Sequence, residues 1–240
     1  MGFLTVARTH VGRRRKINED AMLARPDLGL WAVADGMGGH HAGDVASAMV
    51  VEALEGIAAG GRAPARSLEA QRLLAEANAR LVAMAGAGAE PRTIGSTVAV
   101  LLADDGGAFH GLWAGDSRIY HARAGALAQL TRDHTLVQLL VEVGEIQSSE
   151  AQGHPNANIV TRAVGVEARL ELDEVRGEAR PGDLFLLASD GVTRLMDEAE
   201  LLAALQADDL EESADRLVDA CLERGGPDNL SFLMVRVEPG

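Results

Sequence analysis

Short apolar runs that end in polar, turn-forming residues recur along the chain. Two of them, 29–34 and 183–189, run into Asp-Gly steps, which predicts buried strands that stop at turns. Runs rich in β-prone residues predict further strands at 96–103, 108–113, 118–123, 126–130 and 231–237. Because many of these runs follow one another closely, we expect antiparallel pairing, which needs only short connections.

Helical periodicity appears in three other segments. Apolar residues recur at helical spacing in 44–59, in 68–85 after Ser67 as a candidate N-cap, and in 210–224 before Gly225. Runs of strands separated from runs of helices favour an α+β fold over a doubly wound parallel sheet. We therefore expect two packed, mainly antiparallel sheets with helices outside.

The segment 133–165 breaks this pattern. A helix-like piece at 135–143 is followed by a stretch, 144–158, rich in Gly, Ser, His, Pro and Asn. A long irregular insertion in a compact domain usually serves function. At 240 residues the chain is predicted to form a single domain, 1–240, that carries this segment as a flap.

Composition and charge narrow the class of protein. The chain is 47% apolar and 24% charged, as globular domains are, and its net charge of −14 argues against nucleic-acid binding. One cysteine, Cys221, allows neither an internal disulfide nor a Cys-rich zinc site, so we expect a cytoplasmic, reducing location. The basic cluster near the start is followed by no apolar signal region, and the longest apolar runs are too short for membrane insertion.

Acidic residues stand at the ends of several predicted elements. Taken singly, each Asp-Gly step has an ordinary explanation as a turn. Taken together, these residues supply oxygen ligands and almost no nitrogen or sulfur, which favours Mg²⁺, Mn²⁺ or Ca²⁺ over Zn²⁺. Gathered carboxylates repel one another unless cations neutralise them. The residues are Glu19, Asp20, Asp35, Asp116, Asp190 and Asp228.

Motifs that contain these residues run in order through nearly the whole chain. They are GRRRKINED (12–20), VADGMGGHHAGDVAS (33–47), TIGST (93–97), WAGDSRIY (113–120), LTRDHTLVQLL (130–140), VTRAVG (160–165), LLASDGV (186–192) and GPDNLS (226–231). In these motifs the sequence resembles the PPM family, the type 2C class of metal-dependent Ser/Thr protein phosphatases, in its compact bacterial form. The resemblance implies a four-layer α/β/β/α sandwich with Mg²⁺ or Mn²⁺ ions at one end of the sheets.

The resemblance also assigns roles to individual residues. It implies that Asp35 bridges two core ions, that Gly36 binds one of them through its carbonyl, and that Asp190 and Asp228 hold the other. Glu19 and Asp20 would hold metal-bound waters or ligate directly. Asp116 would form a third-ion site together with Asp190, and Arg15 would bind the substrate phosphate.

The implied function is hydrolysis of phosphoserine and phosphothreonine in proteins. A water activated at the dinuclear centre would attack phosphorus, and an arginine fork would meet the phosphoryl charge. The expected partners are phosphoprotein substrates and a cognate bacterial Ser/Thr kinase. Two alternatives stay open: a catalytically silent pseudophosphatase that binds phosphoproteins, and a different dinuclear hydrolase such as a nuclease or nucleotide phosphatase.

One position departs from the family pattern. Some relatives carry a histidine directly after the first Asp-Gly step, as general acid to the leaving alcohol, whereas Met37 stands there in this chain. A metal-bound water, or a flap residue such as His154, could supply that proton instead. The adjacent His40 and His41 are interpreted as solvated loop residues, since neighbouring side chains rarely point at one ion.

Overall fold

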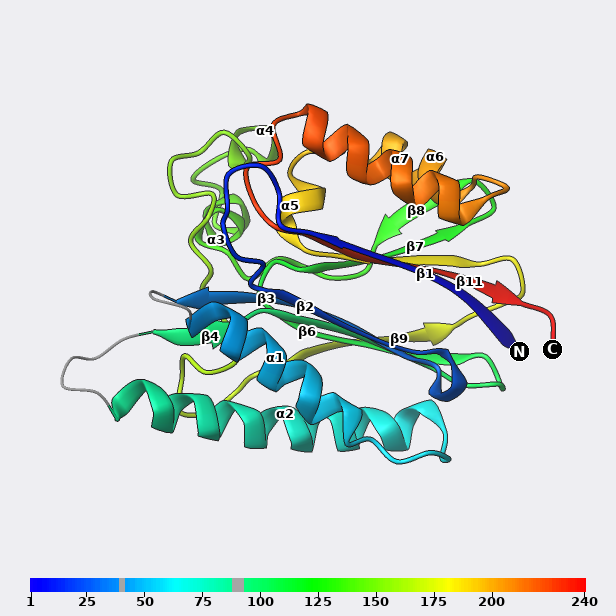
Figure 1. The fold of residues 1–240 in the computed structure, drawn as a ribbon, viewed down its shortest axis with the longest axis horizontal. Helices are drawn as coiled ribbons and strands as arrows, with labels where there is room; N and C mark the ends of the chain where they lie inside the picture. Colours follow the sequence, from blue (N-terminus) through cyan, green and yellow to red (C-terminus); the bar gives the residue numbers. More distant parts are fainter. Residues whose placement is uncertain (39–41, 88–92) are drawn as a thin grey trace.

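The computed structural model describes residues 1–38, 42–87 and 93–240, which form two β-sheets packed face to face (Figure 1). Sheet A has the strand order β1-β11-β10-β7-β8, with bounds Gly2–His10, Leu230–Glu238, Leu184–Ala188, Arg118–Arg123 and Ala126–Gln129. Sheet B has the order β2-β3-β5-β6-β9, with β4 beside β3, and bounds Asp20–Arg25, Leu30–Gly38, Val98–Ala103, Ala108–Ala114, Asp173–Glu178 and Ile94–Ser96. The pairings between these strands are antiparallel, which confirms the predicted α+β class.

Helices cover the outer face of each sheet, so that the layers run α/β/β/α (Figure 1). The long helices α1 (Ala42–Glu55) and α2 (Ala63–Gly86) lie on sheet B. Helices α5 (Asp190–Thr193), α6 (Glu198–Leu205) and α7 (Leu210–Glu223) lie on sheet A, and a short 3₁₀ turn, η1 (Pro26–Leu28), joins β2 to β3. Within the described ranges, no helix combines the length and apolar character that a membrane crossing requires.

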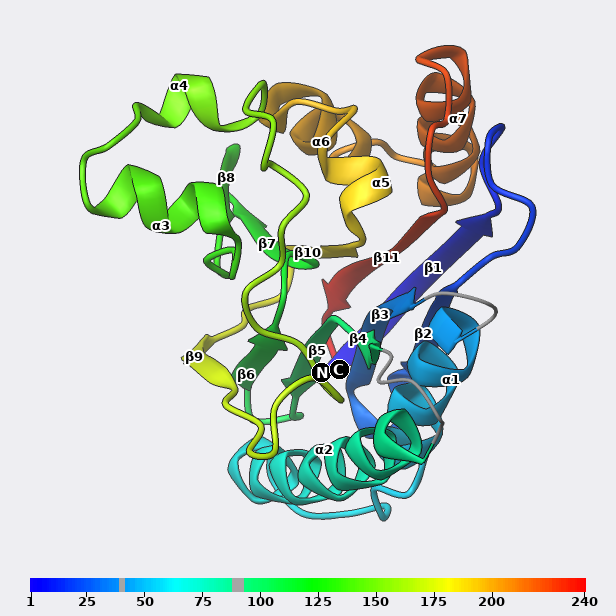
Figure 2. The same ribbon diagram turned by 90° about the vertical axis from the view of Figure 1, so that its left-hand side faces the viewer.

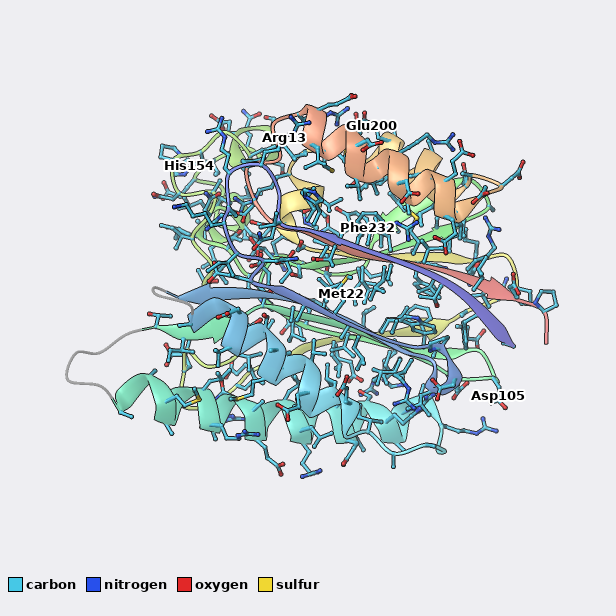
Figure 3. The ribbon with its side chains drawn as sticks, in the orientation of Figure 1. Arg13, Met22, Asp105, His154, Glu200 and Phe232 are labelled. Carbon is cyan, nitrogen blue, oxygen red and sulfur yellow. The ribbon has the colours of Figure 1, made fainter. Side chains whose placement is uncertain are left out.

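Alternation along the strands divides the apolar side chains into three layers. In β3, Leu30, Ala32 and Ala34 pack toward the helices on sheet B. Trp31 and Val33 point the other way, into the core between the two sheets. Phe232 belongs to the third layer, between sheet A and its helices (Figure 3). Because side chains alternate with period two, Asp35 follows Trp31 and Val33 on the inner face of sheet B.

The predicted helices are found, with changes at their ends. Helix α1 stops at Glu55, four residues before the predicted end, and Gly56 follows it. Helix α2 starts five residues earlier than predicted, because Pro64 is accepted in the first turn of a helix. The prediction of Ser67 as N-cap is therefore wrong, and its hydroxyl donates to Glu174 at 2.8 Å instead. Helix α7 begins at the predicted residue.

The strand predictions were incomplete at the edges of both sheets. The first Asp-Gly step does not end a strand, because Gly36 to Gly38 continue β3 and pair with β4. The second does end one, and Asp190 opens the short helix α5. The predicted strand 96–103 is divided at Thr97 into β4 and β5. Strands β1, β2 and β9 and helix α6 were not predicted.

The flap segment, 133–165, lies beside one end of the sandwich, which faces the viewer in Figure 2. It contains α3 (Leu136–Glu142), capped by the Thr135 hydroxyl, and the single turn α4 (Ser148–Ala151). Isolated bridges join Thr135 to Val160 and Ser96 to Val164. The second bridge attaches the flap to β4, next to the acidic end of β3.

Candidate metal centre

The ends of several strands converge at the edge of the sandwich beside the flap (Figure 2). A cavity of about 290 Å³ opens there between the two sheets. The predicted residues that line it are Arg15, Glu19, Asp35, Gly36, Asp116, Asp190 and Asp228. Asp20 is absent from this lining, and its carboxylate accepts a hydrogen bond from the Ser189 hydroxyl at 2.9 Å. The structure thus brings the predicted residues to one edge, with Asp20 behind the others.

Strands β2 and β3 set two of the carboxylates against each other. Asp20 lies directly opposite Asp35 in the antiparallel register. The neighbouring pair is hydrogen-bonded, with the Gly36 amide donating to the Glu19 carbonyl at 3.0 Å. Gly36 is required by space, since a Cβ at this position would lie 1.9 Å from the Gly43 carbonyl oxygen. Helix α1 therefore packs onto the acidic end of β3 only because this residue is glycine.

Thr97, a residue without a predicted role, holds the backbone of Asp35 with its amide and its hydroxyl. The Thr97 amide donates to the Asp35 carbonyl at 2.8 Å, and the Thr97 hydroxyl accepts from the Asp35 amide at 3.0 Å. Thr97 can make both bonds because it stands in the break between β4 and β5. The only indication of this role in the sequence is that Thr97 is the last residue of the TIGST motif. These bonds fix the strand that presents Asp35.

The side chain of Asn229 fastens the loop 11–19 to the start of β11. It accepts from the Glu19 amide at 2.8 Å and donates to the carbonyls of Val11 and Ile17 at 2.9 and 3.0 Å. The side chain is buried, with Asn229 only 4% exposed. This residue follows Asp228 in GPDNLS, yet its role depends on contacts more than two hundred positions away and was not predicted.

The carboxylates at this edge are not fully neutralised by positively charged side chains. Burial, reinforced by Asp190 and Asp228, raises the pKa of Asp20 to about 7, although hydrogen bonds from Ser231 and Ser189 oppose the rise. Burial and neighbouring aspartates also raise the pKa of Asp35 and Asp190. One oxygen each of Asp20 and Asp190, both Oδ1, is buried and has no hydrogen-bond partner among the described residues. Such oxygens fit hard divalent cations.

Two arginine side chains form ion pairs with carboxylates at this edge. Arg15 Nη2 lies 2.8 Å from Asp228 Oδ2. Arg194 Nη2 lies 3.1 Å from Asp116 Oδ2 and 3.1 Å from Asp190 Oδ2. In residues 1–38, 42–87 and 93–240, no three His, Cys, Asp or Glu side chains form a ready-made metal-binding group.

The structure shows where the candidate proton donors and the single cysteine lie. Met37 lines the cavity and has no proton to donate. His154 is not among the lining residues, and its Nδ1 accepts from the Asn156 amide at 3.1 Å within the flap (Figure 3). His40 and His41 lie outside the described residues. Cys221 is buried in the core under α7, where burial raises its thiol pKa to about 11.

Comparison with known proteins identifies the family. The family model described as Protein phosphatase 2C matches residues 9–233. The chain is 39% identical to the Ser/Thr protein phosphatase PstP of Mycobacterium tuberculosis over 96% of its own length and 44% of PstP. It is 37% identical to the Ser/Thr phosphatase Stp of Listeria innocua, over 95% of this chain and 93% of Stp. The chain thus spans less than half of PstP and nearly all of Stp.

Solved structures agree with this result. The catalytic domain of PstP in complex with two manganese ions superposes with a TM-score of 0.88, at 34% identity and 99% coverage of both chains. PppA, described as a key regulatory component of T6SS in Pseudomonas aeruginosa, superposes with a TM-score of 0.88 at 42% identity, over 98% of both chains. The chain belongs to the protein phosphatase 2C family of metal-dependent Ser/Thr protein phosphatases.

Proposed function

We propose that this protein hydrolyses phosphoserine and phosphothreonine in other proteins at a centre of two Mg²⁺ or Mn²⁺ ions. The observation that carries the proposal is the group of partly unpaired carboxylates around Asp35, at the edge where β2 and β3 meet β10 and β11. A protein that used this edge only for stability would have no reason to gather like charges there.

The carboxylates divide into two sets around the cavity. Asp35 and the Gly36 carbonyl come from sheet B, whereas Asp190 and Asp228 flank the strands of sheet A. Asp35 would be shared between two ions, with Glu19 and Asp20 holding their outer ligands. When bound, such ions lower the pKa of a coordinated water and neutralise charge on phosphoryl oxygens.

Arg15 would bind the substrate phosphate. It comes from the loop 11–19, its side chain is 49% exposed, and its partner Asp228 lines the same cavity. The guanidinium would be free to bind a phosphoryl group when Asp228 served instead as a ligand to a cation. The planar fork of arginine suits two phosphate oxygens at once.

A third ion would use Asp116 together with Asp190, the remaining predicted pair. Their carboxylates are side by side, but Arg194 pairs with both. Asp116 and Asp190 could therefore hold a divalent ion only after Arg194 had moved away. The proposal consequently rests on two core ions.

Charge and composition support a proposal for the substrates and the cellular compartment of this protein. The domain 1–240 would act on phosphoproteins, with 133–165 as a flap beside the cavity, and would oppose a Ser/Thr kinase. Its net charge of −14 disfavours nucleic acid as substrate. A single, buried thiol suits a cytoplasmic, reducing environment.

Substrate preference tests the proposal. After EDTA treatment and addition of Mn²⁺, we expect release of phosphate from phosphoserine and phosphothreonine peptides, and much slower release from phosphotyrosine peptides and nucleoside monophosphates. Preference for the nucleotides would favour a different dinuclear hydrolase. Binding of phosphopeptides without phosphate release would favour the pseudophosphatase.

A further inference from the structure

The guanidinium of Arg194 lies between the buried carboxylate of Asp116 and the partly buried carboxylate of Asp190, at the outer side of the metal centre. Its Nη2 is 3.1 Å from an oxygen of Asp116 and 3.1 Å from an oxygen of Asp190. The carboxylate side chains are 6% and 15% exposed, and that of Arg194 is 31% exposed. A side chain of the protein itself thus provides the positive charge between the two residues that were predicted to hold a third ion.

The same guanidinium also holds the flap. Its Nη2 donates to the Ala157 carbonyl at 3.3 Å, and its Nη1 donates to the side-chain oxygen of Asn158. In the reverse direction, the Gln152 side chain donates to the Arg194 carbonyl at 2.8 Å. These contacts join 152–158 of the flap to the residue that directly follows α5.

A divalent ion and this guanidinium would use the same two carboxylates. A cation at the pair would compete for Asp116 Oδ2, which accepts a hydrogen bond from Arg194, and for the Asp190 carboxylate, whose Oδ2 lies 3.1 Å from the same nitrogen. Two positive charges a few ångströms apart in a partly buried site repel each other. Occupation by an ion therefore requires that Arg194 leave, which also breaks its bonds to Ala157 and Asn158.

Arg194 stands where the metal cavity meets a second, larger groove. The groove has a volume of about 860 Å³ and lies between the flap and helices α5 and α6. Asp116, Asn158, Asp190 and Arg194 line both the groove and the cavity. Movement of this one side chain would therefore change the flap, the groove and the outer side of the metal centre together.

We propose that Arg194 is a positioning residue that takes the place of a third ion and latches the flap to the catalytic edge. The proposal rests on the proposed function of this centre and adds a means of control to it. By linkage, the factor by which a third ion weakens flap closure is the factor by which the closed flap weakens binding of that ion. A high concentration of Mn²⁺ would compete with the latch and release the flap.

Counting Mn²⁺ ions by calorimetric titration tests the competition. Arg194→Met keeps the length of the side chain and removes its charge, so we expect it to bind a third ion at least about tenfold more tightly than the parent chain does. Asp116→Asn in the Arg194→Met background should remove the added site. Arg224→Met is the matched control, because Arg224 lines the same groove but pairs with Glu200, and it should bind Mn²⁺ as the parent does.

Hydrogen exchange of the flap amides in EDTA-treated protein tests the latch without any metal or substrate. Exchange over 150–160 should be about tenfold faster in Arg194→Met and unchanged in Arg224→Met. Asn158→Ala, which removes a flap contact and keeps the ion pairs, should also speed exchange, and by linkage it should tighten a third Mn²⁺ ion by less than Arg194→Met does. This variant keeps the latch testable should Arg194→Met fold poorly.

Two results would overturn the proposal. One is a parent chain that binds three ions with equal affinity; the other is Mn²⁺ binding and flap exchange in Arg194→Met that match the parent, with Asn158→Ala also unchanged. Neither readout measures catalysis. A chain without phosphatase activity that still showed the predicted Mn²⁺ and exchange changes would contradict the proposed function and leave the latch intact.

Discussion

Asp20 lies directly opposite Asp35 across the antiparallel pair of β2 and β3. Because the adjacent Glu19 and Gly36 are hydrogen-bonded, these aspartates occupy the closer, non-bonded type of cross-strand position. Like charges in such a pair destabilise a sheet, and burial first, then neighbouring aspartates, raise the pKa of both carboxyl groups. This cost to the fold is the strongest structural reason to place cations at the edge.

Replacement of Asp35 by Asn should separate stability from function. If Asp35 is shared between two ions as proposed, its loss should lower metal-dependent kcat by about a thousandfold or more, since several kcal/mol of metal-derived stabilisation would disappear. The metal-free protein should become more stable by about 1 kcal/mol, because a partly buried like-charge contact between opposite strand positions is removed. Steady-state kinetics and urea unfolding in EDTA measure the two effects.

Asp105→Asn is the control for that change, since Asp105 is exposed and lies at the opposite end of the sandwich (Figure 3). It should alter neither quantity. Asp35→Asn protein that retained substantial turnover with Mn²⁺ would contradict the assignment of Asp35 as the shared ligand.

Replacement of Arg15 by Ala should act mainly on substrate binding. The phosphate would lose a charge-assisted contact while the carboxylates remain, so we expect KM to rise about five- to twentyfold and kcat to change by less than about threefold. Initial rates across a range of phosphopeptide concentrations give both constants. Arg14→Ala, an exposed neighbour, should leave KM near its original value; equal KM values in the two variants would point to another phosphate contact.

Replacement of Asn229 by Ala should destabilise the chain. The Glu19 amide and the carbonyls of Val11 and Ile17 would lose their partner, which costs about 1–3 kcal/mol for buried groups. For a chain of this size, that corresponds to a fall in Tm of about 3–10 °C. Calorimetry measures the shift, and Mn²⁺ affinity should weaken in parallel because Glu19 is no longer fixed. An unchanged Tm would mean that the loop 11–19 is held by other contacts.

Glu174 should contribute a pH-dependent part of the stability. Burial would raise the pKa of Glu174, but hydrogen bonds from Arg176, His110 and Ser67 outweigh it and lower the pKa to about 2. Because the pKa in the folded state lies below the ordinary 4.5, these contacts stabilise the fold above pH 4.5, and the stabilisation is lost as the pH falls toward 2.

Urea unfolding of the Glu174→Gln variant measures this contribution. The variant should be less stable than the parent by about 1–2 kcal/mol at pH 7, and the difference should shrink steadily as the pH falls from 4.5 to 3. A difference that stayed constant over this range would show that packing, rather than the charge of Glu174, provides the stabilisation.

Secondary structure was predicted correctly from the sequence where residues within one short segment determine it. Strand β10 followed by Asp190 and helix α7 before Gly225 were identified from apolar spacing and adjacent turn residues. The ordered motifs predicted which acidic residues would meet. The first Asp-Gly step was misread because its continuation as a strand depends on pairing with β4, about sixty residues further along the chain.

Contacts between distant segments could not be read from the chain. Arg194 is spaced to pair with Asp190 at i,i+4, but its approach to Asp116 arises only when β10 pairs with β7. Ser67 was predicted as an N-cap from local sequence. The helix begins earlier, with Pro64 in its first turn, and the Ser67 hydroxyl bonds to Glu174 on β9. Strand β2 was not predicted, because Asp20, its first residue, belongs to the site rather than to the core.

The most direct test of the central claim is the hydrolysis of p-nitrophenyl phosphate after EDTA treatment, followed by addition of Mn²⁺ or Mg²⁺, with Asp190→Asn alongside. The account predicts no turnover in EDTA, recovery when either ion is added, and no recovery in the Asp190→Asn variant. Turnover that persisted in EDTA, or equal recovery in the Asp190→Asn variant, would contradict a catalytic metal centre at this edge.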